Sequence, residues 1–144
     1  MPLKLSRRST LRLLSASAVA SSGLLAGCDS TPAVIKIGVA QPLSGNLAAL
    51  GQDLLNGVNL AAEEINRDGY KGRCKTVTFE IVAVDDTATA ETVKAVAQQL
   101  VDAGVVAVIG HLNSGVSIAA APIYAGRNIA QLAISTNPKF TQLG

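Results

Sequence analysis

Residues 105–115 read VVAVIGHLNSG, and this stretch decides the fold class of the chain. An apolar run, residues 105–109, leads directly into a loop of small and polar residues. Residues 129–138, IAQLAISTNP, repeat this layout. Near-continuous apolar runs that end at turn residues are typical of parallel strands in a sheet covered by helices on both faces. Ligands of open α/β sheets bind outside the carboxyl ends of such strands, so the loops 110–115 and 135–138 are candidate binding loops.

The rest of the sequence alternates between strand patterns and helix patterns. Strands are expected at residues 34–40, 76–84, 105–109 and 129–134. A helix is expected after each of the first three strands. Strand alternating with helix along the whole chain predicts an α/β fold with a doubly wound parallel sheet and right-handed crossovers.

Each expected helix has an apolar face and a stop signal. The first should end near Gly69 and the second at Gly104, because glycine commonly follows the last helical residue. The third, residues 114–125, contains Pro122, which should kink or shorten it. The expected inward residues are Leu50, Leu54, Val58, Ala61 and Ile65 in the first helix, and Val93, Val96, Ala97, Leu100 and Val101 in the second.

The chemistry of the two candidate loops favours binding over catalysis. Both are rich in hydroxyl and amide groups, and neither carries an acid or a strong base. A dinucleotide site would need closely spaced glycines directly after the first strand, whereas Gly38, Gly45 and Gly51 lie far apart. We therefore predict no cofactor, no metal site and no catalytic residue.

The acidic pair Asp85–Asp86 and His111 need separate interpretation. Asp85 and Asp86 follow the second strand without a third ligand at metal-binding spacing, so we expect Asp86 or Thr87 to cap the next helix. His111 is the only histidine. A Ser-His-Asp arrangement needs an acid to orient the histidine and a nucleophile elbow, and the sequence shows neither, so we expect a structural role for His111.

Ser114 stands where the third helix should begin. Its hydroxyl group suits a helix N-cap. The same position directs helix N–H groups and a hydroxyl towards the candidate site, which suits a carboxylate ligand. The two roles are compatible, and we expect Ser114 to bind ligand.

The amino terminus has the layout of an export signal. Four basic residues, Lys4, Arg7, Arg8 and Arg12, come before an apolar stretch, and the first acid is Asp29. The stretch is too short and too rich in serine for a membrane span, which needs about 20 mostly apolar residues. Residues 6–12, SRRSTLR, resemble a twin-arginine signal, so export by either the twin-arginine or the general route stays open.

Residues 25–28, LAGC, resemble the bacterial lipobox, in which the cysteine is lipidated and becomes the new amino terminus. Residues 1–27 would then be removed, leaving eight basic and ten acidic residues. The apparent basicity therefore belongs to the export signal, and nucleic-acid binding loses its compositional support. Lipidation of Cys28 leaves Cys74 without a partner for a disulfide in this chain, and we expect no redox role for it.

Together, these segments resemble the leucine/isoleucine/valine-binding proteins, which are type I periplasmic binding proteins of ATP-driven amino-acid importers. The resemblance covers essentially all of residues 34–144. It rests jointly on residues 34–45, 51–53, 62–66, 85–86, 110–114 and 135–138.

The resemblance implies roles for individual residues. Ser114 would hydrogen-bond the α-carboxylate of the ligand, and Ser135 and Thr136 would hold its carboxylate and ammonium groups. Leu112 and Asn113 would line the same loop. Leu50 stands where relatives often place an aromatic residue against the ligand side chain.

The resemblance also implies an organisation for the chain. Residues 34–144 would be a partial N-terminal lobe, since such proteins have two lobes that close on the ligand. The residue pattern itself predicts that residues 1–27 are the signal and residues 28–33 a tether. The expected function is that of a truncated, lipid-anchored, extracytoplasmic protein that passes an amino acid to a membrane permease. The alternatives are a binder of amides, urea or another small polar solute, an exported enzyme, and a purely structural lipoprotein domain.

Membrane attachment should depend on Cys28. Replacing Cys28 with serine removes the thiol that accepts lipid, and the remaining chain is too polar to stay on a membrane by itself. We expect Cys28→Ser to move the protein from the membrane fraction to the soluble fraction after cell lysis. Unchanged partition of the variant would contradict the lipobox interpretation.

Overall fold

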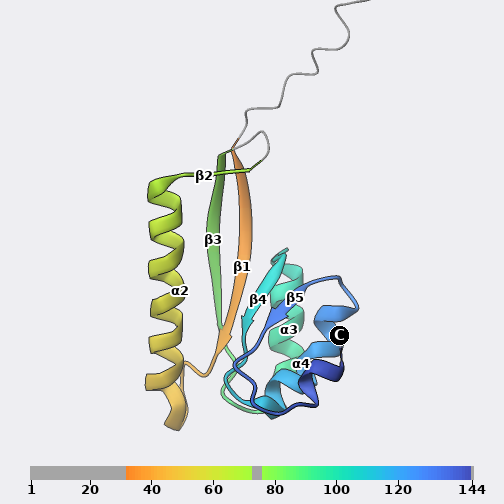
Figure 1. Ribbon diagram of the computed structural model, residues 1–144. Helices are drawn as coiled ribbons and strands as arrows, with labels where there is room; N and C mark the ends of the chain where they lie inside the picture. The colour runs from red at the N-terminus through yellow and green to blue at the C-terminus, as the bar shows by residue number, and fades with distance from the viewer. Residues whose placement is uncertain (1–31, 73–75, 144) are drawn as a thin grey trace, which may run out of the picture.

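The computed structural model describes residues 32–72 and 76–143 of the 144-residue chain. Strands and helices alternate through most of it, as the sequence predicts (Figure 1). Two short 3-10 helices, η1 and η2, supplement them. The elements in chain order are β1 (Ala33–Gln41), η1 (Gly45–Leu47), α2 (Ala48–Asp68), β2 (Tyr70–Lys71), β3 (Thr76–Asp85), α3 (Val93–Asp102), β4 (Ala107–Gly110), α4 (Ser114–Ala125), β5 (Ala130–Leu132) and η2 (Phe140–Gln142).

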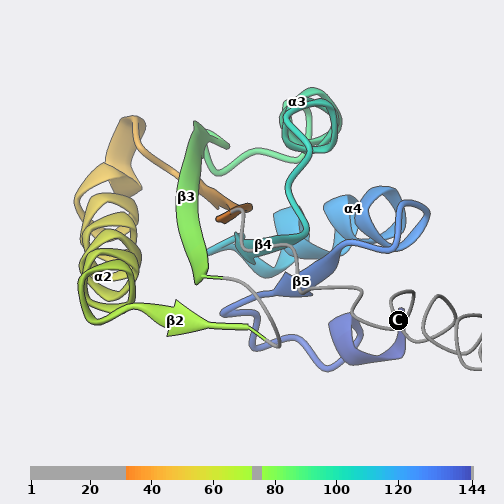
Figure 2. The same ribbon diagram turned by 90° about the horizontal axis from the view of Figure 1, so that it is seen from above.

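One sheet organises the fold, with the strand order β2-β3-β1-β4-β5. The strands β3, β1, β4 and β5 are parallel, which confirms the predicted α/β class. The edge strand β2 pairs antiparallel with β3 and was not predicted, because two residues are too few to show a periodic pattern. Helix α2 covers one face of the sheet, and α3 and α4 lie over the other (Figure 2).

The main core lies between the sheet and the pair α3 and α4. As predicted, α3 turns one apolar face inward, and Leu100 near its carboxyl end is fully buried. Leu100 packs against β1 at Gly38, where an added Cβ would lie 3.1 Å from the leucine side chain. Val108 of β4 and Tyr124 of α4 are also fully buried in this cluster. Burial of each large apolar side chain contributes about 1.5–3 kcal/mol.

The opposite face of the sheet is only partly covered. The predicted inward face of α2 is wrong in detail, because the helix buries Gly51, Leu55 and Ala62 while Leu50 and Ile65 are exposed. The helix packs mainly on β3 and β1 and leaves an apolar groove towards β4 and β5. The groove is lined by Ile37, Val58, Ala61, Ala62, Ile65, Phe79, Ile81, Ala107, Ile109 and Leu132. Part of the predicted stripe therefore faces this groove.

The structure tests two expectations about helix ends. The α4 helix keeps its predicted bounds, so Pro122 does not shorten it, and the Pro122 carbonyl still accepts a bond from the Gly126 N–H at 3.1 Å. Because proline has no backbone N–H, the Ile118 carbonyl receives no helical hydrogen bond from residue 122. The α3 helix begins at Val93 after the N-cap residue Thr92, so neither Asp86 nor Thr87 caps it.

The predicted leader and the predicted lipidation site Cys28 lie outside the described residues, as does Cys74. Within the described part of the chain, no helix is both long enough and apolar enough to cross a membrane.

Helix α2 approaches the β1 loop so closely that only glycine fits at one position. An added Cβ at Gly51 would lie 2.0 Å from the Pro42 carbonyl oxygen, whereas one at Gly57 would meet nothing within 4 Å. Gly51→Ala should lower the free energy of unfolding by about 1–3 kcal/mol through overpacking. Gly57→Ala on the same helix should raise it by about 0.5–1 kcal/mol. Urea denaturation followed by circular dichroism measures both, and equal effects would contradict this contact.

The partly covered sheet face should make residues 28–144 associate. Exposed apolar surface beside an unpaired edge strand favours contact between copies. Leu132 borders the groove and is 59% exposed, and Leu60 on α2 is 58% exposed but lies outside the groove lining. Leu132→Glu should therefore reduce association in sedimentation velocity, and Leu60→Glu should reduce it much less. A monomer with a sharp two-state thermal transition would contradict this prediction, because it would show that the sheet face is stable without further covering.

Candidate ligand-binding site at the carboxyl edge of the sheet

The four parallel strands end at one edge of the sheet, and the predicted loops follow them there. The β1 strand ends at Gln41, β3 at Asp85, β4 at Gly110 and β5 at Leu132. The first turns of α2 and α4 lie at the same end of the molecule (Figure 1). This is the edge at which open α/β sheets bind ligands.

Ser114 and Thr136 come together at this edge. Ser114 is the first residue of α4, after the N-cap residue Asn113, whose side chain makes no capping hydrogen bond. The Thr136 backbone N–H donates to the Ser114 Oγ at 3.3 Å, which joins the loops after β4 and β5. The hydroxyl hydrogen of Ser114 takes no part in this bond, so it is available to an acceptor such as a carboxylate. Helix geometry also leaves the first N–H groups of α4 without acceptors inside the helix.

The other predicted site residues differ in how deeply they are buried. Leu112 and Asn113 lie half-buried on the loop before α4, and Thr136 is exposed. The Ser135 Oγ is buried and has no hydrogen-bond partner within the described part of the chain. Leu50 lies on the first turn of α2 and is 54% exposed, so a separate element supplies it.

Asp86 orients His111, and sequence reasoning missed this pair. The His111 Nδ1 lies 2.6 Å from the Asp86 Oδ2, and both side chains are fully buried. The Asp86 Oδ1 accepts the Ala88 backbone N–H at 2.9 Å. The expectation that no acid orients His111 is therefore wrong, while the expected structural role agrees with its burial. The sequence could have indicated this pair through position alone, because Asp86 follows β3 and His111 follows β4 at the same sheet edge.

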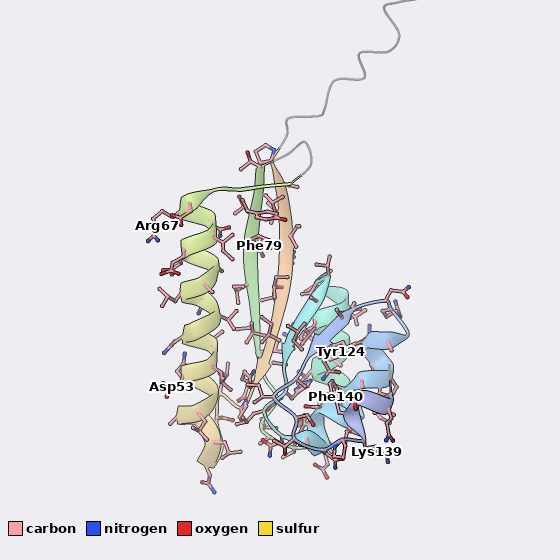
Figure 3. All side chains as sticks on the ribbon, viewed as in Figure 1. Asp53, Arg67, Phe79, Tyr124, Lys139 and Phe140 are labelled. Carbon is pink, nitrogen blue, oxygen red and sulfur yellow. The ribbon has the colours of Figure 1, made fainter. Side chains whose placement is uncertain are left out.

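Tyr124 completes a buried chain of three side chains. Its Oη lies 3.3 Å from the His111 Nε2, and the two rings stack with centroids 6.2 Å apart. Tyr124 lies between α4 and the sheet (Figure 3). Burial, together with the negative charge of Asp86, raises the pKa of Tyr124, which keeps the phenol protonated.

This chain of side chains differs from a hydrolytic triad. The group at the far nitrogen of His111 is a phenol inside the core, and Ser117 donates its hydroxyl to the His111 backbone carbonyl at 3.0 Å. A substrate has no access to either hydroxyl, because Tyr124 and Ser117 are both fully buried. The arrangement is suited to holding a loop in place.

Asp85 braces the neighbouring loop. Its Oδ1 accepts the backbone N–H groups of Leu43 and Thr87, each at 2.8 Å. Burial alone would raise the pKa of Asp85, but a bond from Ser44 and these N–H groups outweigh it and hold the pKa below its usual value. Within residues 32–72 and 76–143, no group of three or more His, Cys, Asp or Glu residues is placed to hold a metal ion.

The geometry of this edge can be compared with known proteins. Residues 34–142 match the family described as periplasmic binding protein. A Leu/Ile/Val-binding protein homolog 2 from Brucella abortus is 40% identical over 109 residues, which cover 75% of this chain and 29% of that protein.

Two solved structures are also similar. The branched-chain amino acid transporter substrate-binding protein LivJ from Streptococcus pneumoniae, in complex with isoleucine, has a TM-score of 0.68 and 31% identity, covering 76% of this chain and 31% of its own. A solute-binding protein from Rhodopseudomonas palustris, in complex with 4-hydroxybenzoate, has a TM-score of 0.63 and 25% identity, covering 77% and 30%. The present chain spans less than a third of the length of these relatives. With its matched residues covering most of the described sheet and helices, the chain belongs to the periplasmic binding protein family.

Proposed function

We propose that this chain is part of a lipid-anchored, extracytoplasmic solute-binding protein that captures an amino acid and delivers it to the membrane permease of an ABC importer. The observation that best supports this proposal is the contact between Ser114 and Thr136, at the edge where the parallel strands end. It joins the two loops that carry the expected ligand contacts.

The proposed ligand contact is a carboxylate at the start of α4. Helix N–H groups and the Ser114 hydroxyl supply donors there, and the positive end of the helix dipole favours negative charge. Ser135 and Thr136, from the loop after β5, would hold the carboxylate and the ammonium group. Leu112, Asn113 and Leu50 would contact the rest of the ligand.

The relatives support the ligand class. The Brucella protein is named for leucine, isoleucine and valine, and the Streptococcus structure holds isoleucine. The Rhodopseudomonas structure instead holds 4-hydroxybenzoate, so an aromatic carboxylate is a second candidate. Both ligands carry a carboxylate, and only the amino acid carries an ammonium group. A neutral amide or urea lacks the carboxylate that α4 would favour.

Binding without catalysis is the proposed mode of action. The loops after β4 and β5 offer hydroxyl and backbone groups, and the Asp86–His111 pair lies within the core. Anchoring through Cys28 would keep the bound solute close to the permease. Release into the permease would follow from opening of the two lobes.

Ligand affinity should depend on Ser114. We would join residues 33–143 to the remaining part of the Streptococcus protein, so that both lobes enclose the ligand, and measure isoleucine binding by calorimetry. A hydroxyl bonded to a buried carboxylate contributes about 1.5–3 kcal/mol, so Ser114→Ala should weaken binding about tenfold to a hundredfold. The 144-residue chain alone should bind far more weakly, because it offers one side of the site.

The control removes a hydroxyl far from the proposed site. Thr78 lies exposed on β3 opposite Val34, near the amino end of β1. Thr78→Ala should therefore leave the affinity unchanged. Unaltered affinity in Ser114→Ala would refute the site assignment. Binding of 4-hydroxybenzoate with no binding of any amino acid would establish the second candidate.

A further inference from the structure

We propose that His111 is a positioning residue for the ligand loop, held by Asp86 and Tyr124 so that the start of α4 keeps one direction. The inference rests on the proposed function in so far as residues 112–114 contact ligand. The structural part, that the buried chain of side chains orders this loop, stands independently of any ligand.

The backbone leading into the loop is held from several elements at once. Gln41 of β1 donates to the Ile109 carbonyl at 3.5 Å, and Gln131 of β5 donates to the Gly110 carbonyl at 3.2 Å. Ser117 of α4 donates to the His111 carbonyl at 3.0 Å. Three successive carbonyl groups therefore each accept a side chain from a different element.

The imidazole ring adds a second set of restraints. The carboxylate of Asp86 accepts only, so the His111 Nδ1 carries the hydrogen of the 2.6 Å bond. The Tyr124 hydroxyl lies at the other ring nitrogen. Because all three side chains are buried, rotation of the ring would leave polar atoms without water or protein partners. The ring thereby fixes His111 relative to β3 on one side and α4 on the other.

The Ser117 hydroxyl links His111 to the proposed ligand loop. The Ser117 Oγ lies 3.0 Å from the His111 carbonyl oxygen and 3.1 Å from that of Asn113, so one hydroxyl spans both ends of the turn. Ser114 follows immediately and accepts the Thr136 N–H. A shift of His111 would therefore alter the turn, the first residue of α4 and the junction with the loop after β5.

The chain offers a matched pair of variants, because it contains two tyrosines. Tyr124→Phe removes only the hydroxyl at the His111 Nε2 and keeps the ring. Tyr70→Phe removes a hydroxyl from an exposed tyrosine on β2. Hydrogen exchange of backbone amides, followed by NMR on the full chain, reports the loop through Thr136 and Ser117 and the core through Leu100.

We expect Tyr124→Phe to speed exchange at Thr136 and Ser117 about tenfold or more relative to Leu100, and Tyr70→Phe to change neither. An equal increase at Leu100 would show a merely structural role and would overturn the proposal. Unchanged exchange at all three amides would overturn it as well.

A second variant tests the same path without any change to the Tyr124 ring. Ser117→Ala removes the hydroxyl between the His111 and Asn113 carbonyls but leaves the bond from His111 to Asp86 in place. Its imidazole Nδ1–H resonance should remain at low field, while the Thr136 amide exchanges faster. Loss of the resonance, or an unchanged Thr136 amide, would contradict the proposed path.

Ligand affinity in the joined two-lobe protein separates the two proposals. Tyr124→Phe should weaken isoleucine binding about threefold to tenfold, less than Ser114→Ala. If the loop amides respond as expected but no amino acid binds, the proposed function fails and the ordering of the loop stands. If isoleucine binds and depends on Ser114 but neither the loop amides nor the affinity responds to Tyr124→Phe, the positioning role fails and the proposed function stands.

Discussion

Parallel pairing of β3, β1, β4 and β5 is the constraint on which the rest of the structure depends. Strands that run in one direction must end at one edge, so each strand–helix connection returns the chain to the opposite edge. Residues distant in sequence therefore meet after the strand ends. The bond from Thr136 to Ser114 and the pair Asp86–His111 both follow from this rule, the first at the surface and the second in the core.

The two faces of the sheet are covered unequally by helices. The face under α3 and α4 carries the main apolar cluster, which includes Tyr124 and therefore supports His111. The face under α2 keeps an apolar groove towards β5. That groove has only apolar lining residues and lacks the few polar groups that orient a small ligand, so it differs from the candidate site at the strand ends. The groove is better suited to packing against protein.

Much of the fold was readable from the sequence because the relevant signals are local. The apolar run 105–109 and the inward face of α3 lie close to their predicted places, and α4 begins at Ser114 as expected. The face of α2 was misassigned, because its apolar residues outnumber those that the sheet beneath it covers. A helix cap is a local pattern, so the sequence favours Asp86 or Thr87 as the cap, but Asp86 pairs over a longer range. Its actual partner lies 25 residues away and is brought close only by strand order. Long-range polar pairs of this kind leave no periodic signal.

The placement of the polar groups supports the proposal that this edge binds a ligand. Catalysis by a histidine needs a ring nitrogen that reaches the reacting atoms. Here both ring nitrogens of His111 face protein partners inside the core, and the residues nearer the surface offer hydroxyl and backbone N–H groups. Such groups stabilise a charged ligand through hydrogen bonds and the helix dipole without transferring protons. Their usefulness depends on direction, since a hydrogen bond weakens steeply when its geometry is poor. The buried side chains of Asp86, His111 and Tyr124 lie beneath the loop, where no solute reaches them. They can therefore fix the direction of the donors in the loop without adding a reactive group to the candidate site.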